Sequence, residues 1–197
     1  MRMVSEDLKA SLIKVSKLAG SRGWCPGTSG NISVLNPDTG EVYIKISGRS
    51  MSDLKPTDIL TLNLDGKVID GSGRPSKEVN FHLGIYKKRK DVKAVLHTHP
   101  PYATAYATAG KPLPMVTATA KLILKKVPIV DYAPPGSKEL AELVVSKFED
   151  PDVCSVIMKN HGVVSVGADI YRALYVTEWV ENEAETAFLY SIIKRLL

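Results

Sequence analysis

Two histidines stand one residue apart behind an apolar run, in the segment AVLHTHP (94–100). Side chains two residues apart on a β-strand point to the same face and lie about 6.6 Å apart along it. His97 and His99 can therefore converge on one metal ion, whose bonds to imidazole nitrogens are about 2.0–2.1 Å long. Thr98 points the other way. Alone, the pair is weak evidence for a metal and more typical of histidines that are packed or hydrogen-bonded in a core.

A third histidine, His161, follows another buried strand in the segment MKNHGVV (158–164). The glycine beside it permits a close approach of the backbone. Three of the four histidines therefore lie at the ends of predicted strands. Three neutral imidazoles that leave a fourth position open are typical of catalytic zinc sites. On spacing alone, a metal centre and packed histidines remain equal alternatives.

The fourth histidine, His82, lies one helical turn after Glu78. We expect His82 to be a helix residue that hydrogen-bonds to a neighbour or to the backbone, rather than a metal ligand. Glu78 lies in the first turn of the same predicted helix, where the helix dipole favours a carboxylate. A helix-start acid and a functional acid are both open at position 78.

Three loops have a composition suited to an anion: PGTSGNIS (26–33), ISGRS (46–50) and RPSKE (74–78). Each places hydroxyl groups beside glycine or at a helix start, where backbone N–H groups can bind phosphate. None is a P-loop or a dinucleotide fingerprint. Each alone is typical of an ordinary turn, but together with the histidines they favour a phosphorylated ligand on a metal.

Composition sets the class of protein. The 197 residues, 44% hydrophobic and 24% charged, indicate one globular domain over residues 1–197. There is no apolar run of about 18 residues and no signal-peptide pattern, so we expect a cytoplasmic protein without a membrane partner. Cys25 and Cys154 suggest no disulfide framework. The net charge of +5 comes from dispersed lysines, and we expect no nucleic-acid partner.

The hydrophobic pattern predicts helices alternating with hairpin-connected strands, and hence a mostly antiparallel sheet with helices on its faces. The last helix, 168–197, is apolar to its end, so we expect it to dock on the body or on another subunit. The predicted elements are helices at 5–19, 76–90, 100–110, 137–150 and 168–197, a short strand between the loop at 27–31 and the turn at 36–40, strands at 42–46, 93–99 and 127–132, and hairpins at 58–70 and 154–167.

The order of these motifs resembles the class II aldolase/adducin-type family, and within it the small L-fuculose-1-phosphate aldolases. The matching segments are GTSGNIS, ISG, PSKE with the following histidine, LHTHPPYA, DYAPPGSKELAE and KNHGVVSVG. They span nearly the whole chain. The resemblance implies an α/β fold, a three-layer α/β/α sandwich with a central, mostly antiparallel sheet. It also implies a homotetramer with active sites at subunit interfaces.

The resemblance further implies one Zn²⁺ per chain, bound by His97, His99 and His161. Glu78 matches the catalytic acid/base, which also ligates zinc before substrate arrives. Lys77 stands where the aldolases tend to have a hydroxyl residue. The residues that match the family's substrate and phosphate contacts are Thr28, Gly30, Asn31, Ser47, Gly48, Ser76 and Lys77.

The implied reaction is reversible cleavage of a ketose 1-phosphate, L-fuculose 1-phosphate or a similar sugar, to dihydroxyacetone phosphate and a short aldehyde such as lactaldehyde. The alternatives on the same scaffold are a sugar-phosphate epimerase, a dehydratase and a decarboxylase. A non-catalytic adducin-like binding protein is a further alternative. The retained histidines and Glu78 argue against that last class.

Overall fold

The structure is a computed structural model that describes residues 2–197, with side chains from Ser5 onward. Its centre is an eight-stranded sheet with the order β4-β3-β2-β1-β5-β8-β7-β6. The strands are β1 (Asn31–Leu35), β2 (Val42–Lys45), β3 (Ile59–Leu62), β4 (Val68–Asp70), β5 (Ala94–Thr98), β6 (Ile129–Val130), β7 (Ser155–Met158) and β8 (Gly162–Gly167).

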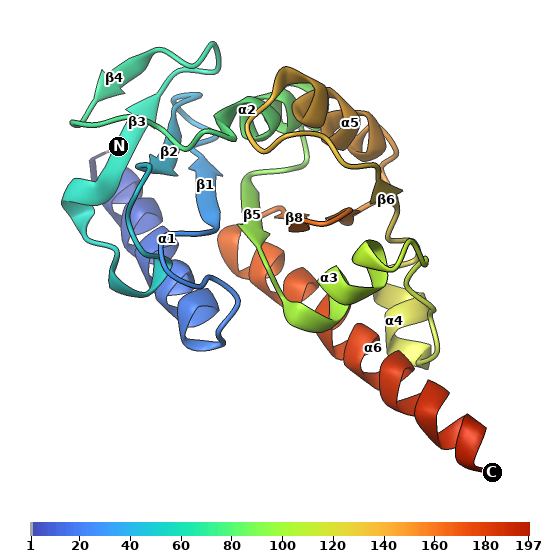
Figure 1. Cartoon of the computed structure of the whole chain (residues 1–197). Coiled ribbons are helices and arrows are strands. Elements are labelled where there is room, and N and C mark those ends of the chain that lie inside the picture. The colour runs from blue at the N-terminus through green and yellow to red at the C-terminus, as the bar shows by residue number, and fades with distance from the viewer. Residues whose placement is uncertain (1) are drawn as a thin grey trace.

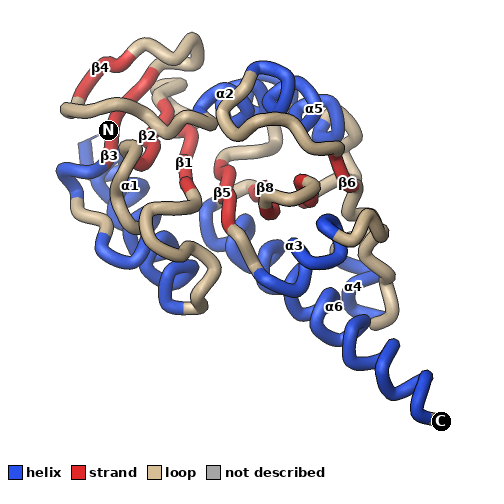
Figure 2. The backbone as a smooth tube through the Cα atoms, viewed as in Figure 1, coloured by secondary structure: helices blue, strands red, loops and turns tan. Residues whose placement is uncertain are grey.

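Six α-helices and two short 3₁₀ helices accompany the sheet in the described part of the chain. The helices are α1 (Arg2–Ser21), α2 (Val79–Lys88), α3 (Pro101–Thr108), α4 (Ala118–Ile123), α5 (Lys138–Phe148) and α6 (Ile170–Leu196), with η1 (Met51–Asp53) and η2 (Pro56–Asp58). The segment between α1 and β1 is a loop that ends where β1 begins (Figure 2).

The sheet is mixed. Neighbouring strands run antiparallel from β4 to β7, whereas β6 runs parallel to β7. The expectation of a mostly antiparallel sheet therefore needs correction at this edge. The physical reason is the connection: β6 reaches β7 through α5, and a crossover through a helix returns the chain in its original direction.

Helices cover both faces of the sheet, which gives the layers α/β/α (Figure 1). On one face, α2 and α5 pack on strand residues that include Val95 and Val164. On the other face, α1 and the first turns of α6 pack on residues that include Ile32 and Leu96, while α3 and α4 pack farther along α6. Strand β5 shows the alternation, since Val95 and Leu96 belong to opposite layers.

The hairpin at 58–70 is confirmed as β3 and β4, with Gly66 in the left-handed region of its turn. The helix expected from a Ser76 cap begins instead at Val79, with Glu78 as its N-cap residue. Helix α4 was not predicted; Thr117 caps it by accepting from the Ala120 N–H. Both cysteines are free thiols. No helix in the described residues is long and apolar enough to cross a bilayer.

The last turns of α6 extend away from the rest of the chain (Figure 1). Large apolar side chains lie exposed there: Phe188, Leu189, Tyr190, Ile192, Ile193 and Leu196. Most of α6 docks on the body of the chain, as expected, whereas these last turns do not.

Candidate metal and phosphate site

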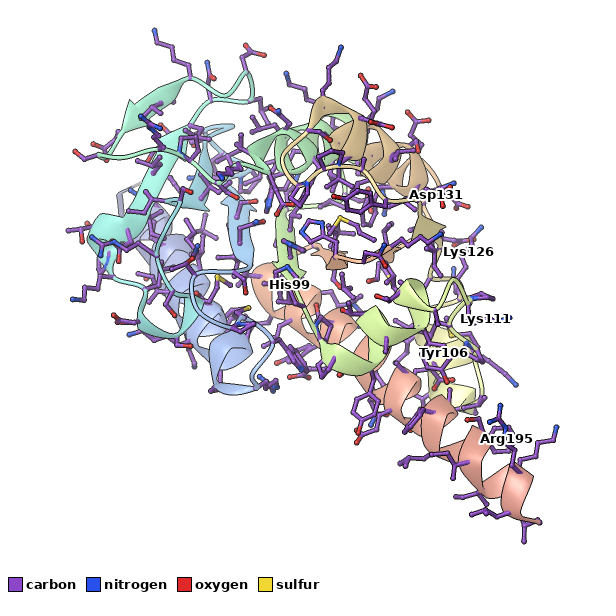
Figure 3. All side chains as sticks on the ribbon, in the orientation of Figure 1. His99, Tyr106, Lys111, Lys126, Asp131 and Arg195 are labelled. Carbon is purple, nitrogen blue, oxygen red and sulfur yellow. The ribbon has the colours of Figure 1, made fainter. Side chains whose placement is uncertain are left out.

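Antiparallel pairing brings the histidines to one edge of the sheet. Strand β5 lies between β1 and β8 and pairs antiparallel with both, so its end meets the beginning of each neighbour. His97 lies opposite Asn31, the first residue of β1. His161 immediately precedes β8. Figure 3 shows His99 at the end of β5, in the middle of the molecule.

The three imidazoles pack closely enough to share one ion. Ring centroids are 4.6 Å apart for His97 and His99, 4.9 Å for His97 and His161, and 5.5 Å for His99 and His161. One ring nitrogen from each lies within 4.8 Å of the other two. The sequence prediction that these side chains converge is therefore confirmed, and the cluster could bind a metal.

Two backbone features of the β7–β8 turn aim His161. Asn160 takes up the left-handed conformation, with φ of 57°. Gly162 has no room for a side chain, because a Cβ there would lie 2.7 Å from His99 Cδ2 and 3.1 Å from His97 Cε1, and would collide with the Thr98 carbonyl. The close approach expected from the HG dipeptide is present.

The histidines are held neutral, as metal ligands must be. Burial lowers the pKa of His97 and His99 to about 3, and neighbouring imidazoles add to the effect. Burial also lowers the pKa of His161. His97 Nδ1 lies 3.0 Å from the Val163 carbonyl oxygen and donates its hydrogen there. Its Nε2 therefore carries a bare lone pair, the tautomer that a metal ligand needs.

Glu78 faces this cluster from the start of α2. Its Oε2 lies 3.3 Å from His97 Nε2, and its Oε1 lies 3.3 Å from His161 Nε2. Among the described residues, His97 Nε2, His99 Nδ1, His161 Nδ1 and Glu78 Oε1 have no hydrogen-bond partner although all are buried.

A carboxylate oxygen that faces a bare imidazole nitrogen in a buried site is unfavourable without a cation between them. Nitrogen and oxygen donors of this kind suit zinc. The donor set therefore fits a metal ion.

The predicted phosphate residues share a cavity of about 450 Å³ with the histidines. This volume lies in the range of small-molecule sites, about 300–1,000 Å³. Every residue that the motifs singled out for substrate, phosphate or metal lines it: Thr28, Gly30, Asn31, Ser47, Gly48, Ser76, Lys77, Glu78, His97, His99 and His161.

Close packing shapes the loops around this cavity. Gly30 has φ of 73°, and a Cβ there would lie 2.8 Å from Cys25 Sγ and 3.0 Å from the His97 carbonyl oxygen. Only glycine fits this conformation and this space. Gly136, with φ of 80°, packs on the backbone and Cβ of Lys77. The loop before α5 therefore packs against the segment RPSKE (74–78).

Lys45, Ser29 and Pro135 also line the cavity, and sequence reasoning missed them. Lys45 is only 2% exposed, and burial lowers the pKa of its ammonium group. The signal was available in the strand VYIK, where Lys45 is two residues from buried Tyr43 and so shares its face.

His82 is not part of the metal cluster. Its Nδ1 lies 2.7 Å from Ser33 Oγ and its Nε2 lies 2.5 Å from Asn31 Oδ1. The prediction of a helix histidine bonded to neighbours is confirmed. Asn31 also donates to Glu78 Oε2 over 2.8 Å, so its amide already has two protein partners.

Comparison with known proteins agrees with this arrangement. Residues 10–188 match the Class II Aldolase and Adducin N-terminal domain. The chain is 39% identical over 182 residues to a protein named L-fuculose phosphate aldolase from Methanococcus maripaludis, covering 92% of this chain and 97% of the relative. It is 28% identical to a 3-oxo-tetronate 4-phosphate decarboxylase from Escherichia coli, covering 94% and 88%.

A solved structure titled L-fuculose 1-phosphate aldolase has the same fold. It superposes with a TM-score of 0.89 and 32% identity, covering 95% of this chain and 87% of the other. The resemblance inferred from the ordered motifs is thereby confirmed. The chain belongs to the class II aldolase and adducin family.

Proposed function

We propose that this chain is a zinc-dependent aldolase that cleaves a ketose 1-phosphate, L-fuculose 1-phosphate or a close analogue, to dihydroxyacetone phosphate and a short aldehyde. The observation that carries the proposal is the single cavity in which three neutral histidines, Glu78 and three anion-binding loops meet. The same combination supports reversible condensation of the two products.

The proposed metal ligands are His97, His99 and His161, with Glu78 as a fourth ligand before substrate arrives. One ion per chain fits the one histidine cluster found in the described residues. When bound, zinc would supply Lewis-acid polarisation of a substrate carbonyl and stabilise the negative charge that develops during C–C cleavage.

The protein's own groups then bind the substrate and move a proton. The backbone N–H groups and hydroxyls of the three loops hold the phosphate, and Lys77 adds a positive charge at the third loop. Ser76 and Lys77 directly precede Glu78, so a phosphate held there places the substrate's first carbons near this carboxylate. The substrate hydroxyl that becomes the aldehyde releases its proton as the C–C bond breaks. Cleavage leaves an electron pair on the triose-phosphate carbon, and Glu78 delivers a proton to that carbon, so no net proton is gained or lost.

We also propose that residues 1–197 form one domain that assembles as a homotetramer with active sites between subunits. The exposed apolar end of α6 supports assembly, since such a surface is costly in water. We propose that the last turns of α6 pack against another subunit.

A screen of ketose 1-phosphates, coupled to enzymatic detection of dihydroxyacetone phosphate, tests the proposed reaction. We expect cleavage that a chelator abolishes and added Zn²⁺ restores. The identity of the aldehyde product would show which ketose 1-phosphate is the substrate. Absence of triose phosphate from every ketose 1-phosphate with metal-loaded protein would refute the aldolase proposal.

Decarboxylation is the second candidate. Lys77 favours it, because a cation near the substrate suits an additional carboxylate, and one relative is named a decarboxylase. Loss of carbon dioxide from a 3-oxo-tetronate 4-phosphate also leaves dihydroxyacetone phosphate. Carbon dioxide in place of an aldehyde as the second product would identify this reaction.

A further inference from the structure

A line of buried polar side chains runs from the core to Glu78. Glu78, His82 and Tyr86 lie four residues apart along α2 and so share one helix face, and Asn31 and Ser33 lie two apart on β1. Helix α2 passes close to β1 (Figure 1). The side chains alternate between the two elements in the order Tyr86, Ser33, His82, Asn31 and Glu78.

Consecutive members are hydrogen-bonded. Tyr86 Oη lies 2.8 Å from Ser33 Oγ, which lies 2.7 Å from His82 Nδ1. His82 Nε2 lies 2.5 Å from Asn31 Oδ1, and Asn31 Nδ2 lies 2.8 Å from Glu78 Oε2. All five residues are buried. Water therefore cannot replace a lost partner without cost.

The carboxylate determines the direction of every bond. Glu78 accepts from the Asn31 amide nitrogen, since a flipped amide would turn its oxygen toward the carboxylate. The Asn31 oxygen can only accept, so His82 Nε2 carries the hydrogen. With His82 neutral, Nδ1 accepts from the Ser33 hydroxyl, and Ser33 accepts from Tyr86. Burial lowers the pKa of His82 to about 3, which agrees with a neutral ring.

We propose that His82 is a positioning residue: Ser33 and Tyr86 hold it as the Nε2–H tautomer, and it fixes the Asn31 amide that aims the Glu78 carboxylate. This inference rests on the proposed role of Glu78 as the acid/base. Asn31 would then have a structural role besides ligand binding, because its amide oxygen accepts from His82 and one amide hydrogen is donated to Glu78.

His82→Leu tests the proposal, because it leaves the Asn31 oxygen without its donor. Loss of such a supporting partner typically costs about 10- to 100-fold in activity. We expect that loss in kcat, with KM and zinc content near wild type, since the three ligand histidines and the anion loops remain. His82→Gln retains an N–H donor and should recover part of kcat. Ser33→Ala and Tyr86→Phe, one and two steps farther out, should have progressively smaller effects.

Nitrogen-15 NMR of histidine-labelled protein reads the His82 tautomer without any substrate. We expect the Nε2–H form in wild type between about pH 6 and 8. An Nδ1–H or doubly protonated ring would overturn the proposal. So would wild-type kcat in zinc-loaded His82→Leu. If wild-type protein cleaved no ketose 1-phosphate, the aldolase proposal would fail, whereas the tautomer would still decide the assignment of His82.

Discussion

The packing at Gly162 predicts that one added methyl group weakens metal binding. In Gly162→Ala the new Cβ would lie 2.7 Å from His99 Cδ2 and 3.1 Å from His97 Cε1. Carbon atoms prefer separations of about 3.5–4.0 Å. The His99 ring or the turn must therefore shift by roughly 0.8 Å, although a binding site tolerates displacements of only about 0.5 Å.

We expect zinc affinity to fall by about 10- to 100-fold, as for other changes that disturb ligand orientation. The metal-free protein should lose about 1–3 kcal/mol of unfolding free energy from overpacking. Competition titration with a chelating dye measures the first quantity, and urea denaturation in chelator measures the second.

Gly84→Ala is the matched control. Its Cβ would also meet a neighbour too closely, Val145 Cγ2 at 2.6 Å, but the contact lies between α2 and α5 and the partner is a side-chain end. Its zinc affinity should equal that of wild type. Unchanged zinc affinity in Gly162→Ala would refute the reasoning, because it would show that the ligand histidines do not depend on this contact.

Lys77→Ala should raise KM more than it lowers kcat if Lys77 contacts the phosphate, and a KM that stays at the wild-type value at every salt concentration would show that the side chain points away. The unfolding free energy of the metal-free protein should fall as pH drops from about 6.5 toward 3. In the folded protein, buried His82, His97 and His99 each have a pKa of about 3 and stay unprotonated in this range. The same histidines in the unfolded chain bind protons, which stabilises the unfolded state as the pH falls. Denaturant titrations that found equal stability at pH 7 and 4.5 would contradict this. Ile193→Glu should convert a tetramer into smaller species in analytical ultracentrifugation; wild-type protein sedimenting as a 21.5 kDa monomer would refute the assembly.

Local chemistry made much of the site predictable. Residue alternation on a strand determines that His97 and His99 share a face, and glycine next to His161 indicates a tight approach. Both inferences needed only neighbouring residues. Their meeting with His161 depends on β5 pairing with β8, which spacing alone leaves undetermined. The family resemblance implied only that the three histidines share a metal.

Longer-range pairing explains what the sequence did not predict. The bonds of Asn31 to His82 and Glu78 join residues 51 and 47 positions apart, and no local pattern encodes them. A lysine is usually exposed, but the sheet is covered on both faces, so Lys45 is buried and lines the cavity. Helix α4 has only six residues, too few for an isolated helix to be stable in water, and packing on α6 stabilises it.

Hydrogen exchange of dihydroxyacetone phosphate in deuterated water is the most direct test of a metal-dependent site in which Glu78 moves the proton, because it requires no knowledge of the aldehyde. We predict that zinc-loaded protein exchanges one hydrogen at the hydroxyl-bearing carbon, that a chelator stops the exchange, and that zinc restores it. Glu78→Gln should retain its zinc and exchange about 10²- to 10⁴-fold more slowly. Exchange that continued in chelated protein, or at the wild-type rate in Glu78→Gln, would contradict the account.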